Sequence, residues 1–366
     1  MNSVTLNDVV LQNNVAQAFP GDDAKGGGLY FNTMDGLLTI TNSVIQNNKA
    51  LGSTSGNGAK GGGIYSDSAA TISGSTLSGN LASANFADGG GAWFANSAVV
   101  VNSTVTGNVA STAGISTNGG TGGGLFFDQG PATLTNVTVA YNQSLGTGSH
   151  GGGIETVSGQ TVQITLVNTL VALNHADGNV GPDYNGAVTH SNHNLIGNAD
   201  GSTGFSAANG DQLGSTANPL DPKLGQLANN GGLTPTLALL SGSPAIHAGD
   251  NGATSTTGPN DQRGAGYARV VNGTIDIGAF AFGAAPSSGG GGGSPSGPAA
   301  PPTLHTPLLL MLFDELLHGV ETVNPNDTET VIDSILGIPL LVSTYDGAGH
   351  LEKVTFVGFD VTALFE

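Results

Sequence analysis

The chain has 366 residues, with 61 glycines, no cysteine, 9% charged side chains and a formal net charge of −19. The absence of cysteine excludes disulfides and thiolate chemistry. Because a phosphate-binding surface needs clustered Lys and Arg, the excess of acids makes nucleic acid and anionic membranes poor partners.

The first half of the chain repeats one pattern with a period of 28–35 residues. Triple glycines recur at 26–28, 61–63, 89–91, 122–124 and 151–153. Thr- and Val-rich segments end in one asparagine per copy: Asn14, Asn48, Asn80, Asn108, Asn142 and Asn174. Two aliphatic columns accompany them: Leu6, Ile40, Ile72, Val100, Leu134 and Leu166, and Leu11, Ile45, Leu77, Val105, Val139 and Val171. A fixed period with constant columns is typical of stacked repeats, one structural turn per copy.

The residue types in these columns predict strands, because Val, Ile and Thr dominate and apolar residues at helical spacing are absent. The two aliphatic columns lie five residues apart, so both point inward only if the chain bends between them, near Asn42 and Ser43. A third inward column follows the triple glycines: Leu29, Ile64, Ala92, Leu125 and Ile154. Three short parallel strands per copy predict an all-β fold, a right-handed parallel β-helix of about six repeat coils plus a terminal coil region.

The six closing asparagines have a structural explanation. Asparagine tolerates left-handed backbone at a corner, and stacked side-chain amides can hydrogen-bond along the axis of the coil. We therefore interpret this column as a structural ladder and not as a ligand site.

Irregular segments join each asparagine to the next triple glycine, at 15–25, 49–60, 81–88, 109–121 and 143–150. They all leave from the same corner of the coil. They form either a variable binding face or simply tolerated variation of length in solvent.

A column of aromatic residues lies beside these segments: Tyr30, Tyr65, Trp93 and Phe126, with Glu155 in the next copy. Strand alternation directs the column outward. The rings could bind the flat faces of sugars, which makes them the candidate glycan-binding residues. Alternatively, the neighbouring segments cover the rings as a satellite core, and this interpretation is favoured. Glu155 implies that part of the column is exposed to solvent.

Patterns for catalysis or metal binding are sparse. Asp67 and Asp128 share a column two rungs apart, about 9.6 Å at ~4.8 Å per rung, which an inverting glycosidase could use. An aspartate at a strand end is more often a turn residue. His190 and His193 have HxxH spacing but no third ligand nearby. We predict no cofactor and no specific metal site, although the acidity leaves adventitious Ca²⁺ binding open.

The period ends after Asn174, and residues 175–283 carry different motifs. In order, these are LIGN, DGSTGF, NPLDPKLG, NNGGLTPTLALLSGSPAI, DQRG and DIGAF. With the GGG-containing coils before them, they resemble the bacterial choice-of-anchor Q surface proteins, within the pectin-lyase-like β-helix group. The resemblance covers about residues 1–283. It implies an exported protein carried on the cell surface by a C-terminal anchor, and no activity is established for that class.

Two positions depart from the family pattern. His247 follows SPAI where the family has Asp, and Ala281 follows DIGAF where the family has Glu. If those acids form a charged cluster or a metal site in relatives, this chain lacks two members of it. The remaining charged residues are interpreted as a structural ion-pair cluster that closes the last coil: Asp261, Arg263, Arg269 and Asp276.

The chain after residue 283 divides into a linker and a tail. Residues 284–302 form a Gly/Ser/Pro linker, and 303–366 form a small C-terminal α+β module or sorting segment. LLLMLFDELL predicts a short amphipathic helix over 308–317, far below the ~20 residues of a membrane span. The sequence after this segment predicts a β-hairpin that turns at Gly347–Gly349.

These features predict a non-enzymatic, exported surface scaffold or adhesin that is extracellular or at the cell surface. Its expected partners are extracellular polysaccharide or cell-surface components. The localisation rests on the resemblance, since no leader pattern follows Met1. The alternative is a polysaccharide-binding or polysaccharide-cleaving β-helix, similar to a lyase or glycosidase. A lyase needs a cationic base, yet no Arg precedes Arg263, and Lys25 and Lys60 stand alone beside their glycines.

Overall fold

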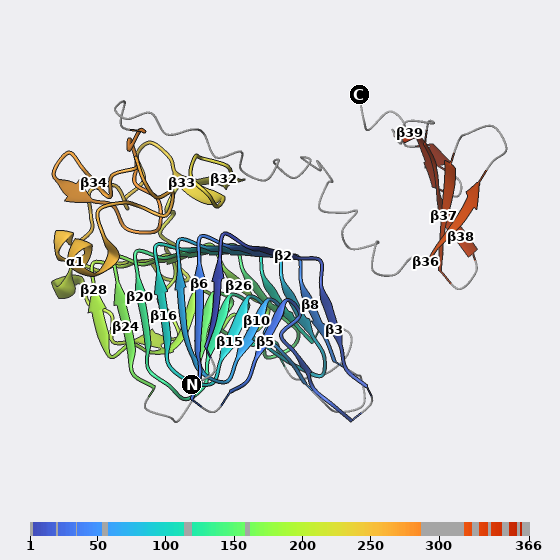
Figure 1. The fold of residues 1–366 in the computed structure, drawn as a ribbon, viewed down its shortest axis with the longest axis horizontal. Helices are drawn as coiled ribbons and strands as arrows, with labels where there is room; N and C mark the ends of the chain where they lie inside the picture. The colour runs from blue at the N-terminus through green and yellow to red at the C-terminus, as the bar shows by residue number, and fades with distance from the viewer. Residues whose placement is uncertain are drawn as a thin grey trace. The chain divides into compact units, whose positions relative to one another are not determined.

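A computed structural model describes residues 3–19, 21–33, 35–52, 58–112, 119–157 and 162–286, and the backbone of strands between 318 and 360. The chain divides into two compact units, 1–295 and 296–366. The first unit is a parallel β-helix, so the predicted fold class is confirmed (Figure 1).

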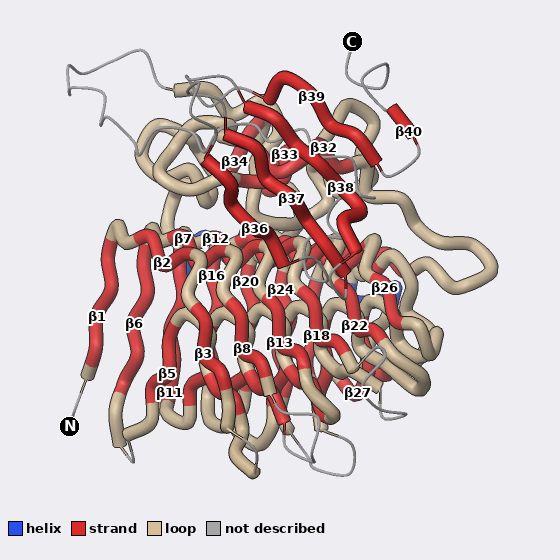
Figure 2. The backbone as a smooth tube through the Cα atoms, turned by 90° about the vertical axis from the view of Figure 1, so that its right-hand side faces the viewer, coloured by secondary structure: helices blue, strands red, loops and turns tan. Residues whose placement is uncertain are grey.

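Four long parallel sheets run along the coil axis (Figures 1 and 2). A short fifth sheet contains strands of the first coils only. Sheet A contains β1 (Val4–Asn7), β6 (Leu37–Thr41), β11 (Ala69–Ser73), β16 (Ala98–Val101), β20 (Ala132–Thr135), β24 (Ile164–Val167) and β28 (His190–Asn192). Sheet B contains β2 (Val10–Gln12), β7 (Val44–Gln46), β12 (Thr76–Ser78), β17 (Thr104–Thr106), β21 (Thr138–Ala140), β25 (Leu170–Ala172), β29 (Leu195–Ile196) and β31 (Gln212–Leu213).

The other three sheets complete the coils. Sheet C contains β3 (Val15–Gln17), β8 (Lys49–Leu51), β13 (Leu81–Ser83), β18 (Val109–Ser111), β22 (Gln143–Leu145) and β26 (His175–Ala176). Sheet D contains β4 (Ala24–Lys25), β9 (Gly58–Lys60) and β14 (Phe86–Asp88). Sheet E contains β5 (Leu29–Phe31), β10 (Ile64–Ser66), β15 (Ala92–Phe94), β19 (Leu125–Phe127), β23 (Ile154–Thr156), β27 (Tyr184–Ala187) and β30 (Ser202–Thr203).

The predicted inward columns form the main hydrophobic core. Ile40, Ile45 and Ile64, one from each of sheets A, B and E, are fully buried, and their equivalents stack above them in register. The bend predicted between the first two columns is also present. Asn42 and its equivalents have left-handed backbone, with φ of 49° at Asn42 and 58° at Gly74.

The prediction of three strands per coil is wrong, because the segments expected to be irregular contain regular strands. Sheets C and D lie within these segments and enclose a second core made only of alanines. Ala50, Ala59 and Ala82 in this core are fully buried. The methyl groups are small enough for the two sheets to approach closely, and such a core gives a weaker sequence signal than Val or Ile.

Residues 198–214 cover the C-terminal end of the coil, with η1 (Ala207–Asn209) and a Phe205 ring edge-on to Tyr184, 5.5 Å between centroids. The following residues, 215–286, form what we call the lateral segment. It contains β32 (Leu224–Ala228), β33 (Thr236–Leu239), η2 (Asn251–Ala253), α1 (Thr254–Thr257), β34 (Val270–Val271) and β35 (Thr274–Ile275).

The lateral segment turns back along the outer face of sheet B (yellow to orange in Figure 1). The hydroxyl of Thr76 donates to the Pro235 carbonyl at 2.6 Å, and the Ala279 amide donates to the Thr138 hydroxyl at 2.9 Å. The segment therefore bridges several coils at once.

The second unit contains five antiparallel strands. They are β36 (His318–Val323), β37 (Glu329–Ile335), β38 (Ile338–Tyr345), β39 (Leu351–Phe356) and β40 (Phe359–Asp360). β38 pairs with β39, as the predicted hairpin requires. The helix expected over 308–317 lies outside the described residues. Within the described part of the chain, no helix is both long and apolar enough to cross a membrane.

Candidate functional site

The asparagine column forms a continuous hydrogen-bonded ladder. From Asn14 to Asn142, each Nδ2 donates to the Oδ1 of the asparagine in the next coil, at 2.8–3.0 Å. The same Oδ1 accepts the backbone N–H of the preceding ladder residue. From Asn48 onward, Nδ2 also donates to a carbonyl of the preceding coil, as Asn48 does to Leu11. The amides are thus used by the fold and leave little capacity for a ligand.

The expected reason for asparagine in this column is only half right. The left-handed residue is the one before each ladder position, with φ of 58° at Asn13, 63° at Gly79 and 62° at Leu173. The ladder asparagine itself does not have positive φ. Its side-chain hydrogen bonds therefore explain the column, whereas backbone tolerance explains the residue before it.

Asp183 ends the ladder, a role that the repeat columns did not predict. Its Oδ1 accepts both the backbone N–H and Nδ2 of Asn174 at 2.9 Å, and its Oδ2 accepts the Asn198 amide at 2.6 Å. A carboxylate suits this end because both of its oxygens accept hydrogen bonds, whereas an asparagine amide would also need an acceptor for its N–H groups. Burial raises the pKa of Asp183 to about 6, partly opposed by these hydrogen bonds.

A register comparison of the sequence could have found Asp183. Ile154 pairs with Tyr184, so GPD at 181–183 occupies the place of GGG at 151–153. A Cβ at Gly153 would approach Nδ2 of Asn174 to 2.7 Å, because the ladder amide fills that space. The aspartate in the third position instead places its own side chain at the end of the ladder.

The aromatic column is a stack of rings on the outward face of sheet E. Ring centroids are 5.2 Å apart between Tyr30 and Tyr65, 4.6 Å between Tyr65 and Trp93, and 6.3 Å between Trp93 and Phe126. Tyr65, Trp93 and Phe126 are buried, with at most 9% of their surface exposed, whereas Tyr30 is 50% exposed. Only Tyr30 among these four candidate glycan-binding residues presents an open ring.

Lysines of sheet D cover the rings. Nζ of Lys25 lies 5.4 Å from the centroid of Tyr65, and Nζ of Lys60 lies 4.9 Å from that of Trp93. Cation–π attraction and the apolar stems of the lysines both favour this cover. Burial, followed by the nearby Asp67 charge, raises the pKa of Tyr65.

The expectation that Glu155 marks a wet part of the column is wrong, since Glu155 is only 1% exposed. His150 Nδ1 lies 2.8 Å from its Oε2, and Asn185 Nδ2 donates to both carboxylate oxygens at 3.0–3.1 Å. These partners replace water. Burial raises the pKa of Glu155 against these contacts, and the hydrogen bond to Glu155 is the main cause that raises the pKa of His150.

A cavity of about 1190 Å³ opens where sheet D meets the start of sheet E. We call it the first-coil cleft. Its principal side chains are Phe19, Asp22, Lys25, Tyr30, Lys60 and Phe86.

The two aspartates predicted to share a column do share one. Asp67 and Asp128 donate backbone N–H groups to Phe31 and Phe94, which places them in one column with Ala95 between them. His193 Nδ1 contacts Asn192 Oδ1 at 2.7 Å. Among the residues that the structure describes, no group of three or more His, Cys, Asp or Glu could hold a metal ion.

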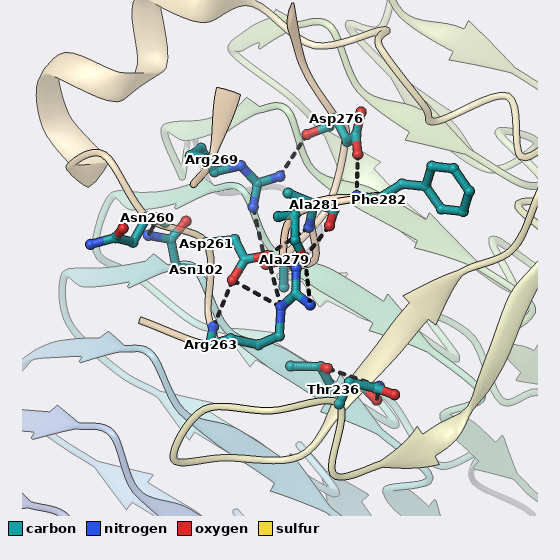
Figure 3. A network of polar contacts seen from close by, with 12 residues as sticks. Asn102, Thr236, Asn260, Asp261, Arg263, Arg269, Asp276, Ala279, Ala281 and Phe282 are labelled. Atoms are coloured by element: carbon teal, nitrogen blue, oxygen red, sulfur yellow. Dashed lines mark hydrogen bonds and ion pairs between the residues drawn. The ribbon is translucent and has the colours of Figure 1, made fainter. Parts of the chain in front are cut away.

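The charged cluster expected at the end of the coil is present, but it lies elsewhere. Asp261 and Arg263 form a buried ion pair at 2.6 Å within the lateral segment (Figure 3). The cluster packs against the side of the coil, because Gln262 between them bonds to β12 and β17. Residues 198–214 cover the end instead.

Arg269 and Asp276 complete the cluster mainly through backbone contacts (Figure 3). Arg269 is fully buried and donates to the carbonyls of Asp276, Gly278 and Ala279 at 2.7–3.0 Å. Burial lowers the pKa of Arg269 to about 10. The cluster holds together the turns of the lateral segment.

Both positions that depart from the family pattern touch this cluster. The backbone N–H of His247 donates to Asp276 Oδ1 at 2.7 Å, and that of Ala281 donates to Asp261 Oδ2 at 2.8 Å. The carboxylates of Asp276 and Asp261 thus accept the backbone N–H groups of these two positions.

The fold and these contacts define the class of the protein as a parallel β-helix with a lateral segment on one side. No family model, curated protein or solved structure matches the chain.

Proposed function

We propose that this chain is a non-enzymatic β-helix scaffold displayed outside a bacterial cell, where it acts as an adhesin. The resemblance of its motifs to those of the choice-of-anchor Q surface proteins supports the export and the display. The parallel β-helix that the resemblance implies is the fold observed.

The observation that carries the proposal is that the buried asparagines and acids of the repeats bond within the coil itself. The ladder amides bond to each other, Asp183 ends the ladder, and Glu155 is held by His150 and Asn185. A catalytic site needs acids or bases whose functional atoms face a substrate. A rigid coil whose segments between the ladder and the triple glycines differ in length from copy to copy instead suits display and contact.

Display is tested on intact cells of the source bacterium. Antibodies against the purified first unit should label intact cells as strongly as permeabilised cells. Labelling only after permeabilisation would contradict display at the surface.

The absence of catalysis is tested separately. The purified chain incubated with polygalacturonate and with neutral polysaccharides should produce neither new reducing ends nor unsaturated products. Sustained turnover that tracks with the protein through purification would overturn the scaffold proposal and favour the lyase or glycosidase alternative.

A further inference from the structure

In sheet D, buried alanines alternate with residues that face the first-coil cleft. Its alanines Ala24, Ala59 and Ala87 are buried in the alanine core. Because strand residues alternate, the neighbours on either side point away from that core. Lys25, Lys60 and Asp88 share one such row, and Gly58 and Phe86 share another.

The triple glycine folds this face against sheet E. Gly26 has φ of 63°, and a Cβ there would overlap the Leu29 carbonyl, so the turn requires glycine. The turn brings the lysines of sheet D over the aromatic column, as the contacts of Lys25 and Lys60 show. At the first coil the corner stays open, and Tyr30 lines the cavity.

Exposed aromatic side chains concentrate in this one place. Over the described ranges, four Phe, Tyr or Trp side chains are classed as exposed: Phe19 at 77%, Tyr30 at 50%, Phe86 at 50% and Tyr141 at 40%. The first three line the first-coil cleft, and Tyr141 does not. Since aromatic residues are only 5% of the chain, three open rings around one cavity form a marked apolar surface.

The charges of the cleft argue against an anionic ligand. Lys25 pairs with Asp23 at 3.7 Å, and Lys60 lies over Trp93. Asp22 and Asp88 add negative charge to the lining. Since the lining holds more acidic than basic side chains, the cleft disfavours carboxylates and sulfates.

We propose that the first-coil cleft binds an uncharged glycan, whose sugar faces lie on Phe19, Tyr30 and Phe86. Aromatic rings offer π-faces to the C–H faces of sugars, while the Asp22 carboxylate and the Tyr30 hydroxyl are polar groups suited to sugar hydroxyls. This proposal rests on the proposed adhesin function, to which it assigns a ligand class. The proposed site therefore contains only Tyr30 of the aromatic column. The other two rings are Phe86 of sheet D and Phe19 of the loop before β4.

The test is titration calorimetry of the full chain with three hexasaccharides: cellohexaose, N-acetylchitohexaose and hexagalacturonate. At least one uncharged probe should bind, and hexagalacturonate should bind more weakly. Tyr30→Ala and Phe86→Ala should each weaken binding roughly twofold to tenfold, the range of one aromatic contact. Tyr141→Ala, an exposed aromatic outside the cleft, is the matched control and should leave affinity unchanged.

Unaltered urea midpoints would show that the cleft variants fold, and Phe86→Ala provides a second test if Tyr30→Ala disturbs the stack. No binding of either uncharged probe, tighter binding of hexagalacturonate, or equal loss in Tyr141→Ala would overturn the cleft. A reducing-end assay on the same mixtures separates the two proposals. Turnover of a bound probe would contradict the scaffold and not the cleft, whereas absent binding would contradict the cleft alone.

Discussion

At the scale of single residues, the molecule relies on side chains that complete backbone hydrogen bonding. A ladder asparagine bonds to both neighbouring coils, and a residue with left-handed backbone precedes it. The two positions have different requirements, one for an amide and one for positive φ, and substitutions can separate them.

Asn108→Ala should lower the free energy of unfolding by about 1–3 kcal/mol, because a buried amide network loses its partners. Asn108 is fully buried; its Oδ1 accepts from Asn80, and its Nδ2 donates to Asn142 and Leu77. Urea denaturation measures the change. Asn14→Ala, at the exposed start of the ladder, is the control and should cost clearly less. Equal losses would mean that burial of the ladder contributes nothing.

Leu173→Asn should raise the free energy of unfolding by about 0.5–1 kcal/mol. Leu173 has φ of 62° and is 41% exposed, whereas the equivalent positions Asn13 and Asn47 already carry asparagine. This backbone conformation costs a residue with a bulky side chain roughly 1–2 kcal/mol of free energy, and it costs asparagine less. Leu240→Asn is the control, since Leu240 is 49% exposed without positive φ. If both variants are more stable than the wild type, the cause is the removal of an exposed leucine and not the relief of backbone strain.

At the scale of elements, the lateral segment is attached to the coil by an apolar cluster, in which Ile277 and Phe280 pack with Leu170 of sheet B, and by polar contacts. Gln262 is the centre of this attachment. Its Nε2 donates to the hydroxyls of Thr76 and Thr234 at 2.9–3.0 Å, and its Oε1 accepts from Thr104 at 2.6 Å. One buried amide therefore joins two coils to two parts of the segment.

Gln262→Ala should loosen the lateral segment more than the coil. The Thr104 hydroxyl would lose its buried acceptor, at a cost of about 1–3 kcal/mol. Hydrogen exchange should accelerate at the amides of Gly278 and Ala279, which bond to the Asn168 carbonyl and the Thr138 hydroxyl. Gln226→Ala, an exposed glutamine of β32, should leave exchange unchanged. Acceleration spread evenly over sheets A and B would contradict a local role.

At the scale of the whole molecule, stability should decrease as the pH rises from about 4 to 7. Burial raises the pKa of Asp183 from 3.8 to about 6, and it raises that of Glu155. The folded chain therefore holds more protons than the unfolded chain in this range, so stability present at the acid end is lost as pH rises through the folded pKa. Asp183 alone accounts for a loss on the order of 3 kcal/mol.

Urea midpoints at about pH 4.5 and 7.5 measure this dependence. The wild-type chain should be the more stable at the lower pH, and Asp183→Asn should show a smaller difference between the two. A wild-type chain that is more stable at pH 7.5 would contradict the assignment of a buried, proton-binding carboxyl to the end of the ladder.

The repeat pattern was sufficient to predict the coil. Columns of Ile, Val and Leu at a fixed period must be buried together, and stacking successive copies buries them all, so columns such as Ile40–Ile72 and Ile45–Leu77 identified the core and its bend. The same logic placed the asparagines in one ladder. The alanine-containing strands of sheets C and D were not predicted, because alanine has little preference for strands.

The lateral segment, the cover over the rings and the burial of single charges depend on contacts that form only in the folded chain. Thr76 bonds to Pro235 across 159 residues, a contact that no repeat specifies. Lys60 covers Trp93 of the next coil because the glycine turn folds sheet D onto sheet E. Glu155 is buried since His150 and Asn185 converge on it from neighbouring positions. A periodic pattern fixes which residues stack, whereas contacts between non-repeating segments depend on side-chain shapes that meet only in the folded chain.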